Sequence, residues 1–243
     1  MRIAVIGASG RMGRALVRLA AEDGIEVVAT LDAGDDLGLL GGKKADVAID
    51  FSAPAGTLAL AAFAPQAGIA IVSGTTGLDE ATLRALDAAS QRVPVLWEPN
   101  MSVGVSVLGD LVRSAIAALG PTFDIEIVEA HHRLKADAPS GTASRLGEIA
   151  QSARADHPRV QHGREGRPGA RPAAEIGMHA VRGGDVIGDH TVFLLGMGER
   201  IELTHRATSR DLFAHGALRA ARFVKGKPAR RYALSELVRA PGS

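Results

Sequence analysis

The residues best suited to chemistry lie in one stretch, residues 129–143, which reads E-A-H-H-R-L-K-A-D-A-P-S-G-T-A. Four side chains in it can carry positive charge: His131, His132, Arg133 and Lys135. Residues 140–142 (S-G-T) then lead into a helical pattern, which would present backbone N–H groups and hydroxyls at the positive end of a helix. Such a set suits a small anion with two carboxylates, beside a His or Lys that moves a proton. A solvated basic loop is the alternative, and the rest of the chain decides between them.

A second candidate site lies near the N-terminus, where an apolar run ends in a glycine-rich turn. Residues 3–6 predict a buried parallel strand, and residues 7–13 read G-A-S-G-R-M-G before a helical pattern. Glycines let a backbone turn tightly and approach a pyrophosphate at a helix N-terminus. The next apolar run, residues 25–31, ends at Asp32, where dinucleotide folds place the acid that binds the adenosine ribose. The whole pattern favours dinucleotide binding over a purely structural strand, turn and helix.

The elements that position these residues alternate through the first half of the chain. Strands are predicted at 47–51, 69–72 and 93–97, and helices at 14–21, 56–67, 79–92 and 103–119. This alternation predicts an α/β, Rossmann-like dinucleotide-binding domain with a parallel sheet. Ligands of such sheets lie beyond the carboxyl ends of the strands, so we expect Ser52 and the turns at 74–77 and 98–101 to share one crevice with the glycine turn. An ordinary β-turn is the alternative interpretation of residues 74–77.

The second half has a different pattern. Strands are predicted at 124–128, 176–181, 186–190, 191–195 and 201–206, with a helix from about 142 to 153 and a long loop at 154–174. Strands after 176 are predicted to be antiparallel, which gives an α+β domain with an open mixed sheet. A helical pattern at 210–224 is expected to rejoin the first domain. Residues 1–102 and 210–243 would then form the discontinuous dinucleotide-binding domain, and residues 103–209 the second domain.

Two features of this second half carry weaker predictions. The 154–174 loop is equally compatible with a lid or subunit contact and with a mobile insertion. Four further histidines are scattered through the predicted strands and the last helix: His179, His190, His205 and His215. No pair of them has metal-ligand spacing with a nearby carboxylate, so we interpret them as structural and predict no metal site.

Composition excludes several classes of function. The chain has 28 Lys and Arg against 27 Asp and Glu, so it has no overall field that would recruit nucleic acid or an anionic membrane. It has no cysteine, which excludes disulfides and thiolate chemistry. Aromatic residues make up 3%, too few for base-stacking platforms. The apolar N-terminal run stops at Gly7, too early for a signal peptide or a membrane span, so we expect a cytoplasmic protein.

The 129–143 stretch resembles the signature of the 4-hydroxy-tetrahydrodipicolinate reductase family, also called dihydrodipicolinate reductase. The resemblance extends over G-A-S-G-R-M-G-R at 7–14, D-F-S-A-P at 50–54, G-T-T-G at 74–77, P-N-M-S-V-G-V at 99–105, R-G-G-D-V-I-G-D-H at 182–190 and T-H-R-A-T-S-R at 204–210. It implies the reduction of 4-hydroxy-tetrahydrodipicolinate to tetrahydrodipicolinate by NADH or NADPH, through hydride transfer to C4 and proton donation, in the diaminopimelate route to lysine. It also implies a homotetramer assembled through the sheet of the second domain. The second domain would bind the small dicarboxylate substrate.

The resemblance implies roles for individual residues. His131 would be the proton donor or acceptor, and Lys135 a proton donor. Substrate contacts would come from His132, Ser140, Gly141 and Thr142. Cofactor contacts would come from three turns and the ribose acid: Gly7, Ala8, Ser9, Gly10, Arg11, Met12, Asp32, Gly74, Thr75, Thr76, Glu98, Pro99, Asn100 and Met101.

One departure from the family pattern bears on the cofactor. Many relatives carry an Arg after the ribose acid, whereas this chain has Ala33. The charge of Asp32 would repel a 2′-phosphate, so we predict a preference for NADH over NADPH, with Lys43 and Lys44 as possible compensation. Two rival functions remain: an amino-acid dehydrogenase acting on aspartate or homoserine, and a nucleotide-sensing module without catalysis. Neither would need paired histidines followed by the S-G-T segment.

Overall fold

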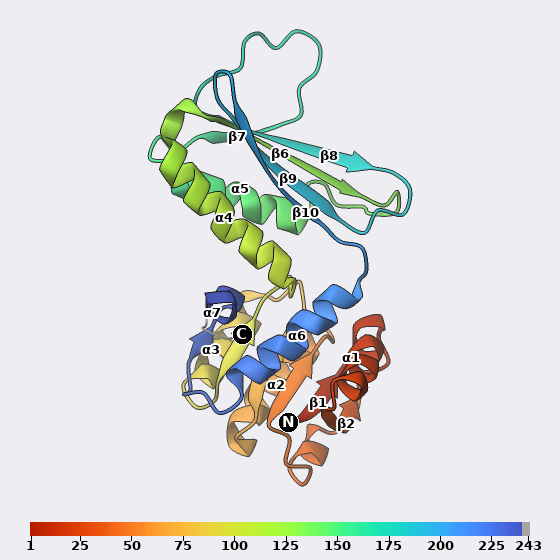
Figure 1. Cartoon of the computed structure of the whole chain (residues 1–243). Coiled ribbons are helices and arrows are strands. Elements are labelled where there is room, and N and C mark those ends of the chain that lie inside the picture. The colour runs from red at the N-terminus through yellow and green to blue at the C-terminus, as the bar shows by residue number, and fades with distance from the viewer. Residues whose placement is uncertain (240–243) are drawn as a thin grey trace. The chain divides into compact units, whose positions relative to one another are not determined.

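The computed structural model describes residues 1–239, and the chain divides into two compact units. Unit 1 comprises Met1–Val103 and the chain from Asp211 onward, and unit 2 comprises Gly104–Arg210. The parallel sheet predicted for the first unit and the mixed sheet predicted for the second are both confirmed (Figure 1).

Unit 1 contains a parallel sheet of six strands in the order β11-β5-β4-β3-β1-β2. The strands are β1 (Arg2–Ile6), β2 (Glu26–Leu31), β3 (Val47–Asp50), β4 (Ala70–Ser73), β5 (Val95–Trp97) and β11 (Arg231–Tyr232). The helices are α1 (Arg11–Glu22), α2 (Pro54–Ala67), α3 (Glu80–Ser90), α6 (Asp211–Val224) and α7 (Leu234–Arg239), with a 3-10 turn at Leu37–Leu40. The edge strand β11, the helix α7 and the 3-10 turn were not predicted, because each is short and has no clear hydrophobic period.

Strand β1 shows why this sheet is covered on both faces. Ile3 and Val5 belong to a core cluster with α1, α6 and α7, whereas Ala4 and Ile6 belong to the cluster beneath α2 and α3. Successive side chains of a strand point to opposite faces, so an unbroken apolar run requires two apolar layers. Strand β2 lies on one side of β1, and the chain then crosses to the other side, where β3 lies next to β1. The carboxyl ends of β1 and β3 are therefore the switch point where such folds bind ligands.

Unit 2 contains a five-stranded mixed sheet in the order β10-β9-β6-β8-β7. Its strands are β6 (Asp124–His131), β7 (Arg159–His162), β8 (Glu175–Arg182), β9 (Asp189–Leu195) and β10 (Arg200–Arg206). The helices α4 (Val103–Leu119) and α5 (Gly141–Ala153), with a 3-10 turn at Gly120–Thr122, complete the unit. Both helices pack on the same face of the sheet around one apolar cluster that includes Ile125, Ile127, Val192 and Leu194 (Figure 1).

The strands after residue 176 run antiparallel to one another, as predicted, but β8 and β9 are not neighbours, because β6 lies between them, parallel to β8 and antiparallel to β9. Two other sequence predictions for unit 2 were wrong. The strands predicted at 186–190 and 191–195 are one strand, β9; the backbone before it bonds instead to the chain after β6, where the Val186 carbonyl accepts from the N–H of His132 at 2.7 Å. The predicted loop at 154–174 contains β7, which pairs in parallel with β8. Each error concerns partners distant in sequence, which local periodicity does not report.

Among residues 1–239, one helical stretch, Val103–Thr122, is long and apolar enough to span a membrane. Three of its apolar residues, Leu108, Val112 and Ile116, are buried in the core cluster of unit 2. One face of this stretch therefore packs against the core of unit 2.

Candidate active site

In unit 1 the glycine turn follows β1 and is tightly packed. Gly7 has a φ of +80°, and a Cβ on it would lie 2.5 Å from the Phe51 carbonyl oxygen. A Cβ on Gly13 would lie 2.2 Å from the Gly7 carbonyl oxygen. No side chain caps the start of α1 at Gly10, and its first turn holds no acidic residue. The turn is therefore tight at positions that only glycine fits, and the first turn of α1 keeps N–H groups without a side-chain cap, which suits a phosphate.

Asp32 follows β2 and lies against this turn. Its carboxylate accepts hydrogen bonds from the backbone N–H of Ser9 at 3.0 and 3.1 Å and from Ser9 Oγ at 2.9 Å. A second carboxylate, that of Asp35, accepts the N–H of Asp32 at 2.7 Å. Two negative charges are therefore gathered beside the glycine turn, at the place where sequence spacing put the ribose acid.

A buried carboxylate that the sequence reasoning missed joins the next two turns of unit 1. Asp50, the last residue of β3, is 0% exposed. Its oxygens accept hydrogen bonds from hydroxyls that follow or face the strand ends: Ser52, Thr57, Ser73 and Thr75. Buried carboxylates need such partners to offset the loss of water. The signal was present in the sequence as an Asp that ends an apolar strand and is followed by hydroxyl residues.

The turns after β4 and β5 pack against each other and against Phe51, which follows β3. A Cβ on Gly74 would lie 2.3 Å from the Phe51 ring, so only glycine fits there without displacing that ring. Trp97 Nε1 donates to the Thr75 carbonyl at 2.9 Å. Thr76 and Pro99 are exposed, whereas Met101 is 1% exposed and packs in the core.

Three turns at the carboxyl edge of the sheet, at 7–12, 74–76 and 98–101, are thus built as candidate ligand contacts. The Asn100 side chain is occupied locally, since its Oδ1 accepts the N–H of Ser102 at 2.8 Å. Glu98 Oε1 accepts the N–H of Leu234 at 3.4 Å, which ties this turn to the C-terminal helix α7.

In unit 2 the candidate residues lie on the helix-covered face of the sheet. Burial alternates along β6, so that Ile125, Ile127, Glu129 and His131 form one buried row. The first two are apolar and the last two are polar, which places a polar patch at the carboxyl end of the strand. The strand register sets His190 of β9 opposite Glu129 and Arg182 of β8 opposite His131. Residues in register share a face, so three strands contribute to this patch.

Glu129 is the centre of the patch. It is 0% exposed, and its carboxylate accepts hydrogen bonds from both terminal nitrogens of Arg182, at 2.7 and 2.8 Å. Glu129 Oε2 lies 2.6 Å from His131 Nδ1, and Oε1 accepts the backbone N–H of Ser140 at 3.0 Å. Burial opposes ionisation of this carboxyl group, but the hydrogen bonds from Arg182, His131 and Ser140 outweigh it and hold the pKa of Glu129 below its usual range.

Ser140 connects this patch to the start of α5. It is the N-cap residue of the helix, and its Oγ accepts the N–H of Ala143 at 3.2 Å. The same Oγ lies 3.1 Å from His190 Nε2, and the ring of His190 meets that of His131 edge to face at 5.2 Å between centroids. The sequence reasoning treated His190 as a structural residue; the structure places it in contact with two candidate residues. Burial, and then the charge of His131, lower the pKa of His190 to about 4.

The other predicted residues of unit 2 lie on the loop between β6 and α5. Lys135 Nζ bonds Asp137 Oδ1 at 2.8 Å, and this bond holds the pKa of Asp137 below its usual value. Arg182 also donates to the Asp137 carbonyl at 2.6 Å, so the same guanidinium holds both Glu129 and this loop. His132 and Thr142 are half-buried, and Gly141 is exposed at the first position of α5. The loop therefore brings cations, and α5 brings its N-terminus, to the place where an anion would bind.

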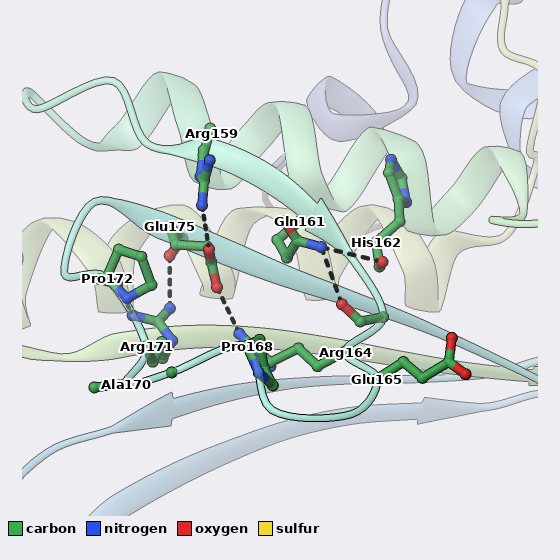
Figure 2. A pocket seen from close by; sticks show the side chains of 12 residues that line it. Arg159, Gln161, His162, Arg164, Glu165, Pro168, Ala170, Arg171, Pro172 and Glu175 are labelled. Atoms are coloured by element: carbon green, nitrogen blue, oxygen red, sulfur yellow. Dashed lines mark hydrogen bonds and ion pairs between the residues drawn. The ribbon is translucent and has the colours of Figure 1, made fainter.

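A pocket of about 560 Å³ elsewhere in unit 2 shares no lining residue with this patch. Figure 2 shows arginines of the 159–172 segment directed at Glu175. Arg164 and Arg171 also bond Glu126, and their charges hold its pKa down to about 2 against the effect of burial. The arginines of this pocket are paired within the chain, so the pocket lacks the free cations of an anion site. Across residues 1–239, no group of three or more His, Asp or Glu side chains is placed to hold a metal ion.

Comparison with known proteins matches both halves of the chain to one family. The family model described as the N-terminus of dihydrodipicolinate reductase matches residues 1–101, and that of the C-terminus matches residues 104–238. A 4-hydroxy-tetrahydrodipicolinate reductase of Anaeromyxobacter sp. is 44% identical, with 98% of this chain and 97% of the relative covered. One from Alkalilimnicola ehrlichii is 45% identical, with 98% of each chain covered.

A solved structure has the same fold. The dipicolinate-bound dihydrodipicolinate reductase from Paenisporosarcina sp. TG-14 aligns with a TM-score of 0.81 at 23% identity, over 96% of this chain and 97% of that one. Family models match nearly the whole sequence, and relatives above 40% identity cover 98% of it. This chain therefore belongs to the dihydrodipicolinate reductase family.

Proposed function

We propose that the protein reduces 4-hydroxy-tetrahydrodipicolinate to tetrahydrodipicolinate with NADH or NADPH, as an enzyme of the diaminopimelate route to lysine. The names of the relatives support this reaction, and the dipicolinate bound to the Paenisporosarcina protein supports a small dicarboxylate as ligand. The observation that carries the proposal is the polar patch of unit 2, where His131 and Ser140 share one buried carboxylate, Glu129, at the start of α5.

Unit 1 fits a dinucleotide. Only glycine fits at 7, 13 and 74, where a Cβ would collide with the chain itself, so these turns are as tight as a dinucleotide site needs. The start of α1 has no side-chain cap, which leaves N–H groups there for a pyrophosphate. We assign cofactor contacts to the residues named from the family resemblance, in the turns at 7–12, 74–76 and 98–101 and at Asp32. The nicotinamide of a bound NAD(P)H would supply the hydride that adds to C4 of the substrate.

Unit 2 supplies the proton and the anion contacts. His131 and Lys135 are assigned proton donation, because both are ionisable groups at the carboxyl end of β6 or in the loop that follows it. His132, Ser140, Gly141 and Thr142 are assigned to the substrate, whose carboxylates would be held by N–H groups and hydroxyls at the start of α5. Cations close to the reacting ring stabilise the negative charge that hydride addition creates.

The cofactor preference is a finer proposal, and it rests on the acidic groups near the glycine turn. Asp32 and Asp35 both carry negative charge where a 2′-phosphate would lie, and the next residue is Ala33. We expect a higher kcat/KM with NADH than with NADPH. Steady-state kinetics with both cofactors tests this, and a kcat/KM clearly higher with NADPH would overturn it.

Assembly and location are also proposed from the family resemblance. We propose a cytoplasmic homotetramer assembled through the sheet of unit 2, in which residues 103–209 bind substrate and residues 1–102 and 210–243 bind the dinucleotide. Light scattering coupled to size-exclusion chromatography measures the mass of the assembly directly. A monomer at micromolar concentration contradicts the tetramer.

The reaction itself is tested by two variants. His131→Ala and Lys135→Ala should each lower kcat by about 10² or more, because each removes an ionisable group from the reacting centre, while NADH still binds. Oxidation of NADH is followed at saturating substrate, and NADH binding by calorimetry. His215→Ala, a change at an exposed position of α6, is the matched control. If either variant keeps near-normal turnover, its assigned role is wrong, and no turnover by the wild type defeats the proposed reaction.

A further inference from the structure

The two ring nitrogens of His131 lie in different surroundings. Nδ1 is 2.6 Å from Glu129 Oε2. Nε2 lies beside Gly188, where a Cβ would come within 3.0 Å of it. His131 is 9% exposed, so its ring has little freedom to turn over. The chain therefore distinguishes the two nitrogens, and the question is which of them carries the proton in the neutral ring.

The contacts of Glu129 decide the direction of the short hydrogen bond. Its two oxygens accept two bonds from Arg182 and one from the Ser140 N–H, and Oε2 makes the fourth contact, with His131 Nδ1. The first three donors have no lone pair to offer, so the carboxylate is held in its acceptor-only form. An ionised carboxylate at 2.6 Å requires a hydrogen on Nδ1.

Arg182 stabilises the ionised form of Glu129. Its two bonds to Glu129 neutralise a carboxylate that is 0% exposed, so the charge does not have to be quenched by a proton taken from His131. The same side chain bonds the Asp137 carbonyl at 2.6 Å, in the loop that carries Lys135. Arg182 thus links the support of His131 to the loop that carries the other candidate proton donor.

The other nitrogen of the ring, Nε2, faces a glycine and a neutral histidine. Glycine at 188 leaves room beside Nε2, and the nearest ring, that of His190, meets His131 edge to face. His190 is neutral near pH 7 because burial lowers its pKa to about 4. A proton arriving on Nε2 of His131 therefore does not face a charged imidazole.

We propose that Glu129 is a positioning residue that, held by Arg182, fixes the Nδ1–H tautomer of His131 and so makes Nε2 the nitrogen that exchanges a proton with the substrate. The proposal rests on the proposed function for the identity of the substrate, but not for the tautomer. In the exchange, the Nε2–H bond of the imidazolium breaks and the substrate gains the proton, which leaves the neutral ring with its hydrogen on Nδ1. The Glu129 carboxylate keeps its charge throughout.

The tautomer is measured directly by ¹⁵N NMR of the uniformly labelled full-length protein at pH 8, through two-bond ring correlations. We expect His131 to show a protonated Nδ1 and an unprotonated Nε2. His179 provides an internal reference, because its Nε2 lies 2.8 Å from Glu126 and should be protonated instead. A His131 signal with its proton on Nε2 overturns the proposal, whether or not the protein turns over its substrate.

Two variants separate the tautomer from access to Nε2. Glu129→Gln should give a mixed or Nε2–H signal for His131 and lower kcat by about 10², since a misplaced tautomer disables a general acid while NADH binding in unit 1 is unaffected. Gly188→Ala should keep the Nδ1–H signal and still lower kcat/KM for the substrate. Glu126→Gln, a matched change on the same strand, should leave the His131 signal unchanged. Near-normal kcat in Glu129→Gln overturns the proposal while leaving the proposed reaction intact.

Discussion

The stability of unit 2 should depend on pH through His190. This side chain is 4% exposed, its Nε2 is engaged with Ser140 Oγ, and its Nδ1 is buried with no hydrogen-bond partner among residues 1–239. Protonation would put a charge in a buried place and leave one N–H without an acceptor. The pKa of His190 in the folded chain is accordingly about 4, against 6.5 when exposed, with burial as the main cause and the charge of His131 as the second.

The magnitude follows from that difference. One pKa unit corresponds to about 1.4 kcal/mol, so a drop from 6.5 to about 4 corresponds to about 3 kcal/mol. Between these two pH values the unfolded chain binds the proton and the folded chain does not. The free energy of unfolding should therefore fall as the pH drops from 6.5 to 4, with the contribution fully present above pH 6.5 and lost below pH 4.

The assay compares the wild type with His190→Gln, which cannot titrate in this range. Urea unfolding at a fixed protein concentration, followed by far-UV circular dichroism at several pH values from 7 to 4, gives the free energy of unfolding of each. The advantage of the variant over the wild type should grow by about 3 kcal/mol across this range, because the other titrating groups are common to both proteins. His215→Gln, at an exposed position, should follow the wild type. Equal pH dependence of the wild type and His190→Gln refutes the reasoning.

Three further changes test other parts of the structure. Glu126→Gln should destabilise the protein at pH 7, because the pKa of Glu126 is about 2 and its ionised form contributes about 3 kcal/mol to the free energy of unfolding. The free energy of unfolding of the variant should also fall less than that of the wild type between pH 4.5 and 2, which unfolding measured at several acid pH values checks. Gly216→Ala puts a Cβ 1.8 Å from the Met101 carbonyl oxygen and should destabilise by about 1–3 kcal/mol or more, whereas Gly42→Ala, with open space around it, should not; an unchanged Tm for Gly216→Ala contradicts the packing. Asp50→Asn removes an acceptor from the buried hydroxyls, including that of Thr75, and should raise the Kd for NADH about tenfold. The Kd is read from the emission of Trp97, the single tryptophan, which bonds the Thr75 carbonyl. An unaltered Kd contradicts the role of Asp50 in holding the cofactor turns.

Strand and helix alternation was enough to predict the class of each unit. Unbroken apolar runs such as residues 3–6 require a sheet covered on both faces, and the glycines at 7, 10 and 13 mark a tight turn, in which no side chain fits at 7 or 13. These features depend on near neighbours in the sequence, so periodicity reports them. Ser140 lies just before the predicted helix, and in the structure it caps α5, which was not predicted.

The supports of the unit 2 site were not predictable in this way. Glu129 lay inside the named stretch, yet nothing local showed that it meets Arg182 and His190, which are more than 50 residues away. Those contacts depend on β6 lying between β8 and β9, an order set by pairing along the whole strands. One signal was available: Glu129 and His131 continue the alternation of Ile125 and Ile127, and a polar residue on a buried face demands a partner.

The sequence by itself thus determined which residues are ionisable, which turns are rich in glycine, and which family has both features. The tertiary structure alone decided how that chemistry is arranged. It set a buried carboxylate against one nitrogen of His131, neutralised it with an arginine from a neighbouring strand, and placed a second histidine beside it. The physical reason is that strand order and register bring distant residues onto one face, whereas the local sequence states only which face each residue takes.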